Sequence, residues 1–294
     1  MRDTDRLIRV DRHDDGLNSW EMARIAPPAP LAGTIAGYMD YHERTSCFTV
    51  RRELPHAEGV LIVNLGAPIG VTGGDGAMIR LGAGEAFAAG VHLRPALSHS
   101  DGSQKGMHVF LPLATLRRLL GIPMGEMIDR VVPLDAVLGK AARDLGIRLL
   151  EANAAEPNGR HARIALLDAA LIARLAECPP VRAEVTEAIG LLITRPDLDI
   201  AAIARDIGWS RKHLAACVRD TVGVGPRSFR RLIRFQRLTA IMADDRAPDW
   251  AGLACDAGYC DQSHLIREFR EFADMTPTEF IARSLGDGGG LIER

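Results

Sequence analysis

The spacing of apolar positions changes along the chain, from short alternating runs in the first third to a helical period in the remainder. Short β-prone runs are separated by segments rich in Gly, Pro and Ser, and they occupy 20–25, 47–54, 59–65, 77–81, 85–89 and 107–111. Short strands at this spacing predict an antiparallel barrel or sandwich. From 112 onward helices are expected at 113–120, 134–138, 141–152, 162–177 and 181–194. The pattern therefore predicts an α+β chain.

The last third of the chain contains one pattern of apolar and polar residues twice. The pattern of 203–226 recurs in 253–277. The offset is 50 residues up to the pairs Gly208-Trp209 and Gly258-Tyr259, and 51 residues after them. Each copy predicts a helix, a glycine turn and a second helix. This arrangement, with exposed polar side chains on the second helix, is typical of the helix-turn-helix, which places that helix in the major groove of DNA.

The ends of these helices can also be predicted. Asp199, Ser210 and Asp261 are expected N-caps, and Gly208 suits the left-handed residue that ends a helix. A linker helix is expected over 226–244, because proline at its first position has no N–H to lose. A single helix between two such units fixes their separation, and reading helices on one side of a duplex should lie about 34 Å apart.

The C-terminal segment 196–284 resembles the DNA-binding domain of the AraC/XylS family of bacterial transcription regulators. The residues that carry the resemblance are Ala204, Gly208, Ser210, His213, Leu214, 223–226, Arg234, Phe235, 257–259, 261–265, Phe269, Thr276, Pro277 and Phe280. The resemblance implies an all-α domain with two helix-turn-helix units that binds double-stranded promoter or operator DNA. It also implies a cupin-like N-terminal domain that takes a small-molecule effector, a homodimer, and RNA polymerase as a partner.

The resemblance further implies which residues meet DNA. Outward positions early in each recognition helix read base edges, and these are Lys212, Ala215, Ala216, Ser263, His264 and Arg267. Side chains expected at phosphates are Arg211, Arg219, Arg227, Arg230, Arg231, Arg234, Gln262 and Arg270. Alanine offers only a methyl contact to thymine, whereas Arg267 can bind the O6/N7 edge of guanine with two hydrogen bonds. The second unit is therefore expected to supply more sequence information than the first.

The distribution of charge indicates that the first unit contributes more to DNA affinity than the second. The segment 205–237 carries nine basic residues against two acids, and 244–261 carries five acids against one arginine. We therefore expect the first unit and the linker helix to hold phosphate while the second unit reads bases. Alternatives stay open for single residues: His213 is expected to pack locally, His264 either packs or reads, and the arginine-rich linker face is either bound to phosphate or solvated.

The predicted organisation has five parts. They are a flexible arm at 1–16, a β-rich effector domain at 17–111, a helical bridge at 112–195, the tandem helix-turn-helix domain at 196–284 and a flexible tail at 285–294. In the family such a bridge carries the dimer contact. The Ala- and Leu-rich face of 164–176 serves either that contact or internal packing.

Whole-chain composition limits the remaining possibilities. The net charge is −2, so DNA affinity must come from local clustering of arginine. The N-terminus has no signal-peptide core, and no apolar run reaches membrane-spanning length, which predicts a cytoplasmic protein with no membrane partner. The cysteines Cys47, Cys178, Cys217, Cys255 and Cys260 form no C-x-x-C pair. They are expected to be unpaired thiols, with Cys217 and Cys255 at core positions.

Metal and enzyme chemistry find little support. His92, His99 and His108 could be cupin metal ligands, but the close H-x-H pair of that motif is absent, so surface or core histidines are expected. The glycine-rich segment 70–84 lacks the Gly-Lys-Ser/Thr of a phosphate loop. We expect no enzyme activity, no metal and no cofactor. The alternatives are a DNA-binding regulator without an effector and a cupin-type metal enzyme fused to a DNA-binding domain.

Overall fold

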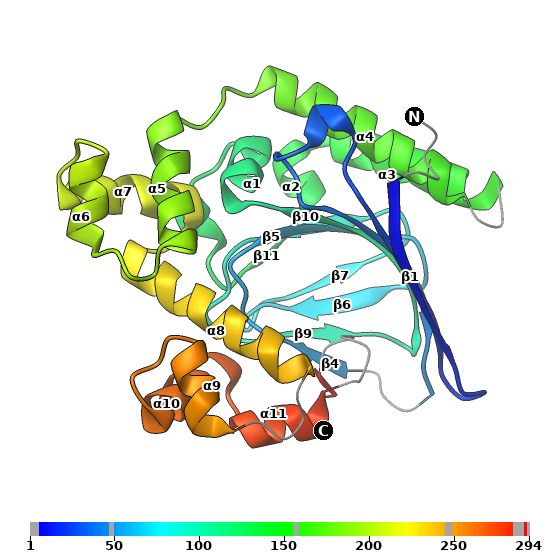
Figure 1. The fold of residues 1–294 in the computed structure, drawn as a ribbon. Coiled ribbons are helices and arrows are strands. Elements are labelled where there is room, and N and C mark those ends of the chain that lie inside the picture. The colour runs from blue at the N-terminus through cyan, green and yellow to red at the C-terminus, as the bar shows by residue number, and fades with distance from the viewer. Residues whose placement is uncertain (1–5, 47–49, 156–158, 245–248, 285–290, 293–294) are drawn as a thin grey trace.

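The computed structural model describes residues 6–46, 50–155, 159–244, 249–284 and 291–292 of the 294-residue chain. It confirms the α+β class, with β-sheets in the N-terminal part and helices in the C-terminal part (Figure 1). Figure 1 shows two facing sheets, two long helices across the top of them, and the remaining helices around their left and lower sides.

Two antiparallel sheets form the N-terminal part. In the described residues the larger has the order β1-β2-β3-β10-β5-β8-β11 and the smaller β12-β4-β9-β6-β7. The bounds are β1 (Leu7–Asp14), β2 (Ser19–Ile25), β3 (Gly37–Arg44), β4 (Val50–Glu53), β5 (Gly59–Asn64), β6 (Ile69–Thr72), β7 (Met78–Leu81), β8 (Ala86–Ala89), β9 (Ala96–His99), β10 (Ser103–Leu111), β11 (Val131–Pro133) and β12 (Leu291–Ile292). Side chains alternate across a strand, so Tyr41 and Glu43 of β3 face the space between the sheets while Asp40 faces the covering helices.

Most predicted strands are confirmed. β2, β5, β7, β8 and β10 coincide with predicted runs, and β4 lies within the sixth, whose residues 47–49 are outside the described residues. The flexible arm predicted at 1–16 is wrong for the residues of β1, which pair with β2. The flexible tail predicted at 285–294 is wrong for β12, which pairs with β4. β1 and β12 are each held by backbone pairing with another strand, which the local pattern of their own residues does not reveal.

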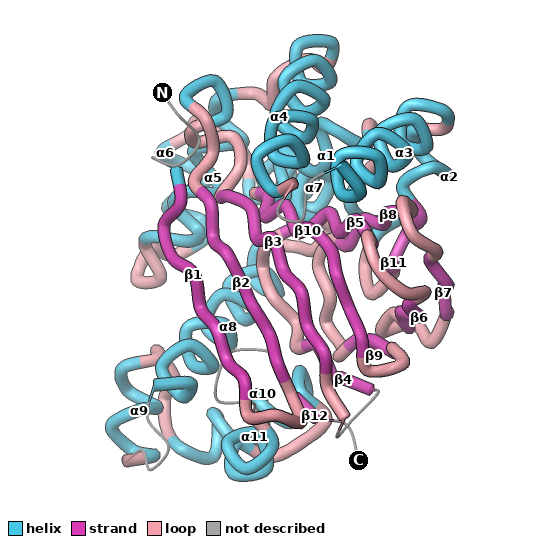
Figure 2. The backbone as a smooth tube through the Cα atoms, turned by 90° about the vertical axis from the view of Figure 1, so that its right-hand side faces the viewer, coloured by secondary structure: helices cyan, strands magenta, loops and turns pink. Residues whose placement is uncertain are grey.

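Five helices form the bridge, as predicted. They are α1 (Leu113–Leu120), α2 (Leu134–Leu138), α3 (Lys140–Ala155), α4 (Arg160–Glu177) and α5 (Ala183–Thr194), with short 3-10 helices η2 (Ala29–Leu31) and η3 (Met124–Met127) nearby. α3 and α4 cover the outer face of the larger sheet (Figure 2). The apolar residues Ile164, Leu167, Leu171 and Leu175 of α4 are all buried within the chain. This face therefore serves internal packing.

Buried ion pairs fasten α4 to the sheet. Arg163 donates to Asp40 at 2.6 Å, and both side chains are almost fully buried. Arg6 pairs with Asp168 at 2.6 Å, and the Tyr38 hydroxyl donates to the same carboxylate at 2.5 Å. Each of these charges has a partner of opposite sign, and breaking one pair would leave a costly unpaired charge between helix and sheet.

Six further helices form the C-terminal part. They are α6 (Ile200–Asp206), α7 (Arg211–Val222), α8 (Pro226–Asp244), α9 (Trp250–Asp256), α10 (Gln262–Ala273) and α11 (Pro277–Arg283). The predicted caps at Ser210 and Asp261 are confirmed, since their side chains accept from backbone N–H groups at 3.1 and 2.7 Å. Asp199 is also the N-cap residue of its helix, as predicted, with extended backbone but without a capping hydrogen bond from its side chain. Gly208 and Gly258 have φ of +76° and +84°, a left-handed conformation that ends the first helix of each unit and redirects the chain into the second.

The thiols are only partly as predicted. Cys178, Cys217, Cys255 and Cys260 are free, and Cys47 lies outside the described residues. Cys217 is half-buried, as a packed thiol would be. Cys255 is exposed, so its predicted core position is wrong, because it lies on the outer side of the short helix α9 while Leu253 and Ala254 are buried.

Candidate nucleic-acid interface and ligand cavity

The recognition helix of the first unit, α7, presents a small polar surface. Lys212 and Ala216 are exposed and Ala215 is half-buried. His213 packs against Trp209 with ring centroids 4.6 Å apart, and its Nε2 lies 3.6 Å from the sulfur of Cys217. These contacts agree with local packing for His213.

The recognition helix of the second unit, α10, is more strongly polar. Ser263 and Arg267 are exposed. His264 is held from three sides: its ring meets Tyr259 with centroids 5.2 Å apart, its Nδ1 accepts from the Cys260 N–H at 3.5 Å, and its Nε2 lies 3.8 Å from Glu268. The structure therefore gives His264 an internal role, while Arg267 stays available to a base.

Two of the arginines expected at phosphates serve an internal carboxylate instead. Glu268 is 3% exposed and accepts from Arg231 at 2.8 Å and from Arg234 at 2.7 Å. Burial by itself would raise the pKa of Glu268, but the hydrogen bonds from Arg234 and Arg231 outweigh it and lower the pKa. Arg231 also reaches Glu271 at 2.5 Å. This cluster joins the linker helix α8 to α10.

Sequence reasoning did not find Glu268, although a signal exists. An acid stands beside the core Phe269 on the inward side of α10, and two arginines three residues apart lie on one face of α8.

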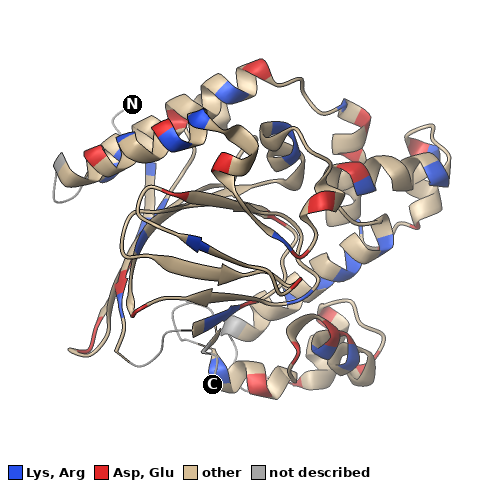
Figure 3. Ribbon diagram, turned by 180° about the vertical axis from the view of Figure 1, so that it is seen from behind, with Lys and Arg blue, Asp and Glu red and all other residues tan. Residues whose placement is uncertain are grey.

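Arg230, also expected at phosphate, is bonded within the protein, because it donates to the Arg195 carbonyl at 3.1 Å. The remaining residues expected at phosphates are exposed: Arg211, Arg219, Arg227, Gln262 and Arg270. In the ribbon of Figure 3, basic positions are marked in blue along α8 and on the helices beside it.

The two units are attached to different parts of the N-terminal region. The end of α7 meets α1, where Arg117 pairs with Asp220 at 2.6 Å and donates to its backbone carbonyl at 3.1 Å. The second unit meets the smaller sheet, where Arg52 of β4 donates to the Ala273 carbonyl at 3.3 Å and β12 pairs with β4. Ala57 also donates to the side chain of Gln236 in α8 at 3.2 Å.

A cavity of about 410 Å³ lies between the two sheets, a size typical of small-molecule sites. Its apolar lining comes from Val60, Ile62, Ile69, Val71, Phe87, Ala89, Phe110 and Val131. Its polar lining includes Tyr41, Glu43, Arg51, Glu53, His56, His92 and His108. Sequence reasoning left the effector site unknown, because the cavity depends on the separation of two sheets.

Burial controls the ionisation of these polar groups. It lowers the pKa of His56 and of His108 to about 4, so both are uncharged at neutral pH. Burial also raises the pKa of Glu53, against the opposing charge of Arg51. The Glu53 side chain is accessible to solvent, and it lines the cavity rather than the outer surface of the protein.

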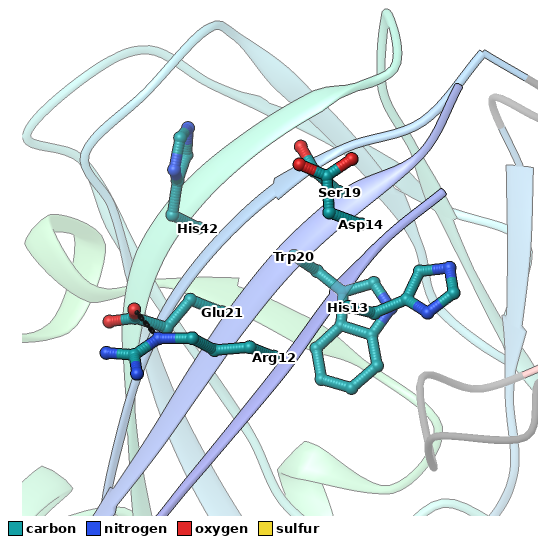
Figure 4. A pocket seen from close by; sticks show the side chains of 7 residues that line it. All are labelled: Arg12, His13, Asp14, Ser19, Trp20, Glu21 and His42. Atoms are coloured by element: carbon teal, nitrogen blue, oxygen red, sulfur yellow. Dashed lines mark hydrogen bonds and ion pairs between the residues drawn. The ribbon is translucent and has the colours of Figure 1, made fainter. Parts of the chain in front are cut away.

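A second, shallower hollow of about 300 Å³ lies along β1, β2 and β3. Figure 4 shows its side chains, among which Arg12 and Glu21 are joined at 2.6 Å and the rings of His13 and Trp20 are stacked with centroids 5.7 Å apart. The apolar wall that lines the cavity between the sheets has no counterpart here beyond Trp20. The enclosed cavity is therefore the better candidate for a ligand.

The histidines considered as metal ligands do not form a metal centre in the described chain. No group of three or more His, Cys, Asp or Glu residues there could hold a metal ion. His99 instead lies 3.1 Å from the Thr72 hydroxyl, while His92 and His108 line the cavity. Among the described residues no helix is long and apolar enough to cross a membrane.

Comparison with known proteins identifies one domain. Residues 203–283 match the family described as a helix-turn-helix domain, which confirms the predicted resemblance of this segment to AraC-type DNA-binding domains. No curated protein matches the chain.

Several solved structures are similar. ToxT from Vibrio cholerae O395 is 13% identical, with a TM-score of 0.47, and the alignment covers 80% of this chain and 96% of ToxT. ToxT from strain SCE256 with unsaturated fatty acid bound is 12% identical, with a TM-score of 0.47, over 79% of this chain and 93% of its own. A DNA-binding transcriptional dual regulator from Escherichia coli K-12 is 26% identical, with a TM-score of 0.29, over 36% of this chain and 92% of its own.

Proposed function

Because the chain carries a C-terminal helix-turn-helix domain of the AraC type, we propose that it is a sequence-specific transcription regulator controlled by a small molecule in its N-terminal domain. The observation that carries the proposal is the pair of recognition helices α7 and α10, both with exposed polar residues at their outward positions. Promoter or operator DNA is the partner, with Lys212, Ala215 and Ala216 at bases in the first unit and Ser263 and Arg267 in the second. His264 orients α10 from within.

We further propose that the first unit and the linker helix bind phosphate while the second unit reads bases. Fewer residues are proposed at phosphates than the sequence predicts. They are Arg211, Arg219, Arg227, Gln262 and Arg270, all of which are exposed. Arg230, Arg231 and Arg234 are left out because their guanidinium groups bond to protein oxygens. A side chain that is already paired would have to break that pair before meeting phosphate.

Selection of bound DNA from a random pool tests the proposal with the full chain. The expected result is one enriched sequence with defined bases opposite both units and a stronger preference opposite α10. Binding to all sequences alike, at any salt concentration, would contradict a sequence-specific regulator.

Effector control rests on the cavity and on β4. Pleat alternation places Arg51 and Glu53 in the cavity wall while Arg52, between them, contacts the second unit. A ligand that moves β4 would therefore shift Arg52 and change the position of α10, whose Ala273 carbonyl it holds. Filling the cavity by Ala89→Phe tests this: the variant should fold and bind DNA but lose any response to ligand. An unchanged response would favour the alternative of a regulator without an effector in this cavity.

We also propose a homodimer that recruits RNA polymerase in the cytoplasm, without enzyme activity or metal. Because the apolar face of α4 is used internally, the free edge strand β1 is the candidate dimer contact. Antiparallel pairing of two copies about Val10 would set Arg9 against Asp11 of the other copy, an attractive cross-strand pair. Light scattering should show a dimer that Val10→Pro converts to a monomer, and a dimeric variant would exclude this edge.

A further inference from the structure

The cavity has a polar end whose charges do not balance. Glu43 of β3 and Arg51 of β4 form an ion pair across it, with side chains 4% and 11% exposed. Glu53 lies two residues beyond Arg51 on the same face of β4 and also lines the cavity. This end therefore holds two carboxyl groups and one guanidinium.

One oxygen at this end has no partner in the described residues. Glu43 is 3% exposed, and its Oε2 atom is buried without a hydrogen bond. A buried acceptor of this kind is expensive to leave unpaired. It lines a cavity with room for a small molecule, so a ligand with an N–H or O–H group would satisfy it.

Among the described residues that line the cavity, none beside Arg51 places a second positive charge at this end. Arg24, the other arginine in the lining, is opposite Met39 in the sheet register, and its Cα lies four residues, or about 13 Å of strand, from the level of Glu43. His56 and His108 have pKa values of about 4 and contribute no charge at neutral pH. Burial raises the pKa of Glu53, as expected for a carboxyl group that lacks a sufficient counter-charge.

The rest of the cavity suits an apolar ring. Phe87 and Phe110 line it with Val60 and Val71. At its polar end Tyr41 lies over Gly106, where an added Cβ would come 2.8 Å from the Tyr41 hydroxyl. The glycine therefore leaves the room that the tyrosine needs.

We infer that the effector is a small amphipathic cation, whose protonated amine bonds to Glu43 and Glu53 and whose apolar body packs against Phe87 and Phe110. This inference rests on the proposed effector role of the cavity. A carboxylate in the same position would face two acids, and the neighbouring guanidinium of Arg51 is already paired with Glu43. The selectivity therefore favours an amine over an isosteric alcohol, and an alcohol over an acid.

Three probes with one skeleton test the assignment: 4-phenylbutylamine, 4-phenylbutan-1-ol and 4-phenylbutanoate, titrated calorimetrically into the full chain at pH 7. The amine should bind roughly tenfold more tightly than the alcohol, because hydrogen bonds to charged groups are the stronger ones. In Glu53→Gln the amine should lose about that factor while the alcohol keeps its affinity within about twofold. Glu58→Gln, at an exposed acid outside the cavity lining, is the matched control.

Three results would overturn the assignment: no binding of the amine, equal or tighter binding of the acid, or an amine advantage that survives in both Glu53→Gln and Glu43→Gln. Far-ultraviolet circular dichroism establishes that each variant is folded. DNA binding is measured on the same samples. Failure of the amine preference with DNA binding intact removes only the ligand class, whereas failure of the wild-type chain to bind DNA removes the proposed function.

Discussion

The two helix-turn-helix units share one scaffold but differ in what holds them. The first is joined to α1 by Arg117 and Asp220, whose side chains are 34% and 46% exposed. The second is held through Glu268, which is 4% exposed and bonded to two arginines of α8. It is also attached to the sheet that forms part of the cavity wall, through β4 and β12.

This difference separates duplication of a scaffold from duplication of a function. Both copies keep the capped recognition helix and the glycine turn, because these depend on local sequence. The attachments depend on neighbours, which the copies do not share. In the part of the chain that the structure describes, the bonds to β4 come from the second unit, so a ligand in the cavity should act first on the unit that we propose reads bases.

The largest expected effect comes from removing the buried carboxylate. Glu268→Ala leaves Arg231 and Arg234 partly buried and unpaired, which should reduce the free energy of unfolding by about 3–5 kcal/mol. Asp220→Asn, which breaks the exposed pair of the first unit, should cost less than about 1 kcal/mol. Urea unfolding followed by fluorescence measures both. Equal losses would mean that the two attachments are energetically alike.

The C-terminal strand should be the next most sensitive attachment. Leu291 is 2% exposed, and Leu291→Ala should destabilise the chain by about 2 kcal/mol, the lower end for a buried leucine because a strand end can relax. Ile8→Ala, at a position 67% exposed, should change stability by less than about 0.5 kcal/mol. Thermal unfolding compares the pair. A neutral Leu291→Ala would remove β12 from the attachment of the second unit.

Base preference should separate the units by chemistry. Arg267→Ala should reduce discrimination at one base pair by about 1–3 kcal/mol while the dependence of affinity on salt stays nearly constant. Arg211→Ala should weaken binding to all sequences and lower the salt slope by about 1. Fluorescence anisotropy against a set of single-base variants at several salt concentrations measures both quantities. Exchanged outcomes would reverse the division between reading and holding.

The smallest expected effect is a pH dependence centred on the cavity. An unfolded histidine has a pKa of about 6.5, whereas burial lowers that of His56 to about 4. Between these values the unfolded chain binds more protons, so stability falls as the pH is lowered from about 6.5 to 4. His56→Gln should remove up to roughly 3 kcal/mol of that fall by pH 4, while its effect at pH 7 is the smallest of the set. His13→Gln, at an exposed histidine, should leave it unchanged.

The sequence predicts the duplicated units well because their signals are local. A serine or aspartate cap, a glycine turn and an apolar stripe are each read within a dozen residues. The strand β5 is found for the same reason, since Val60 to Val63 form a continuous apolar run. Charged β1 and β3 and the glycine-flanked β6 carry no such run, and their order comes from pairing with other strands.

The candidate sites are predictable to different degrees. Arg267 and Lys212 can be placed from helix periodicity alone, and both are exposed. Arg231 and Arg234 of α8 pair with Glu268 of α10. Because this pairing joins two helices, the pattern within α8 alone does not predict it, and both arginines were expected at phosphates. The pairing of Glu43 with Arg51 likewise depends on how two sheets face each other.

The pairing of β12 with β4 also has a consequence for synthesis. β4 is made early, yet its edge receives Leu291 and Ile292 only after nearly the whole chain has left the ribosome. Until then the smaller sheet presents an open strand edge, which is where nascent chains pair wrongly with one another. Pairing with β12 therefore protects this edge, and a chain shortened to end before Leu291 should aggregate more readily.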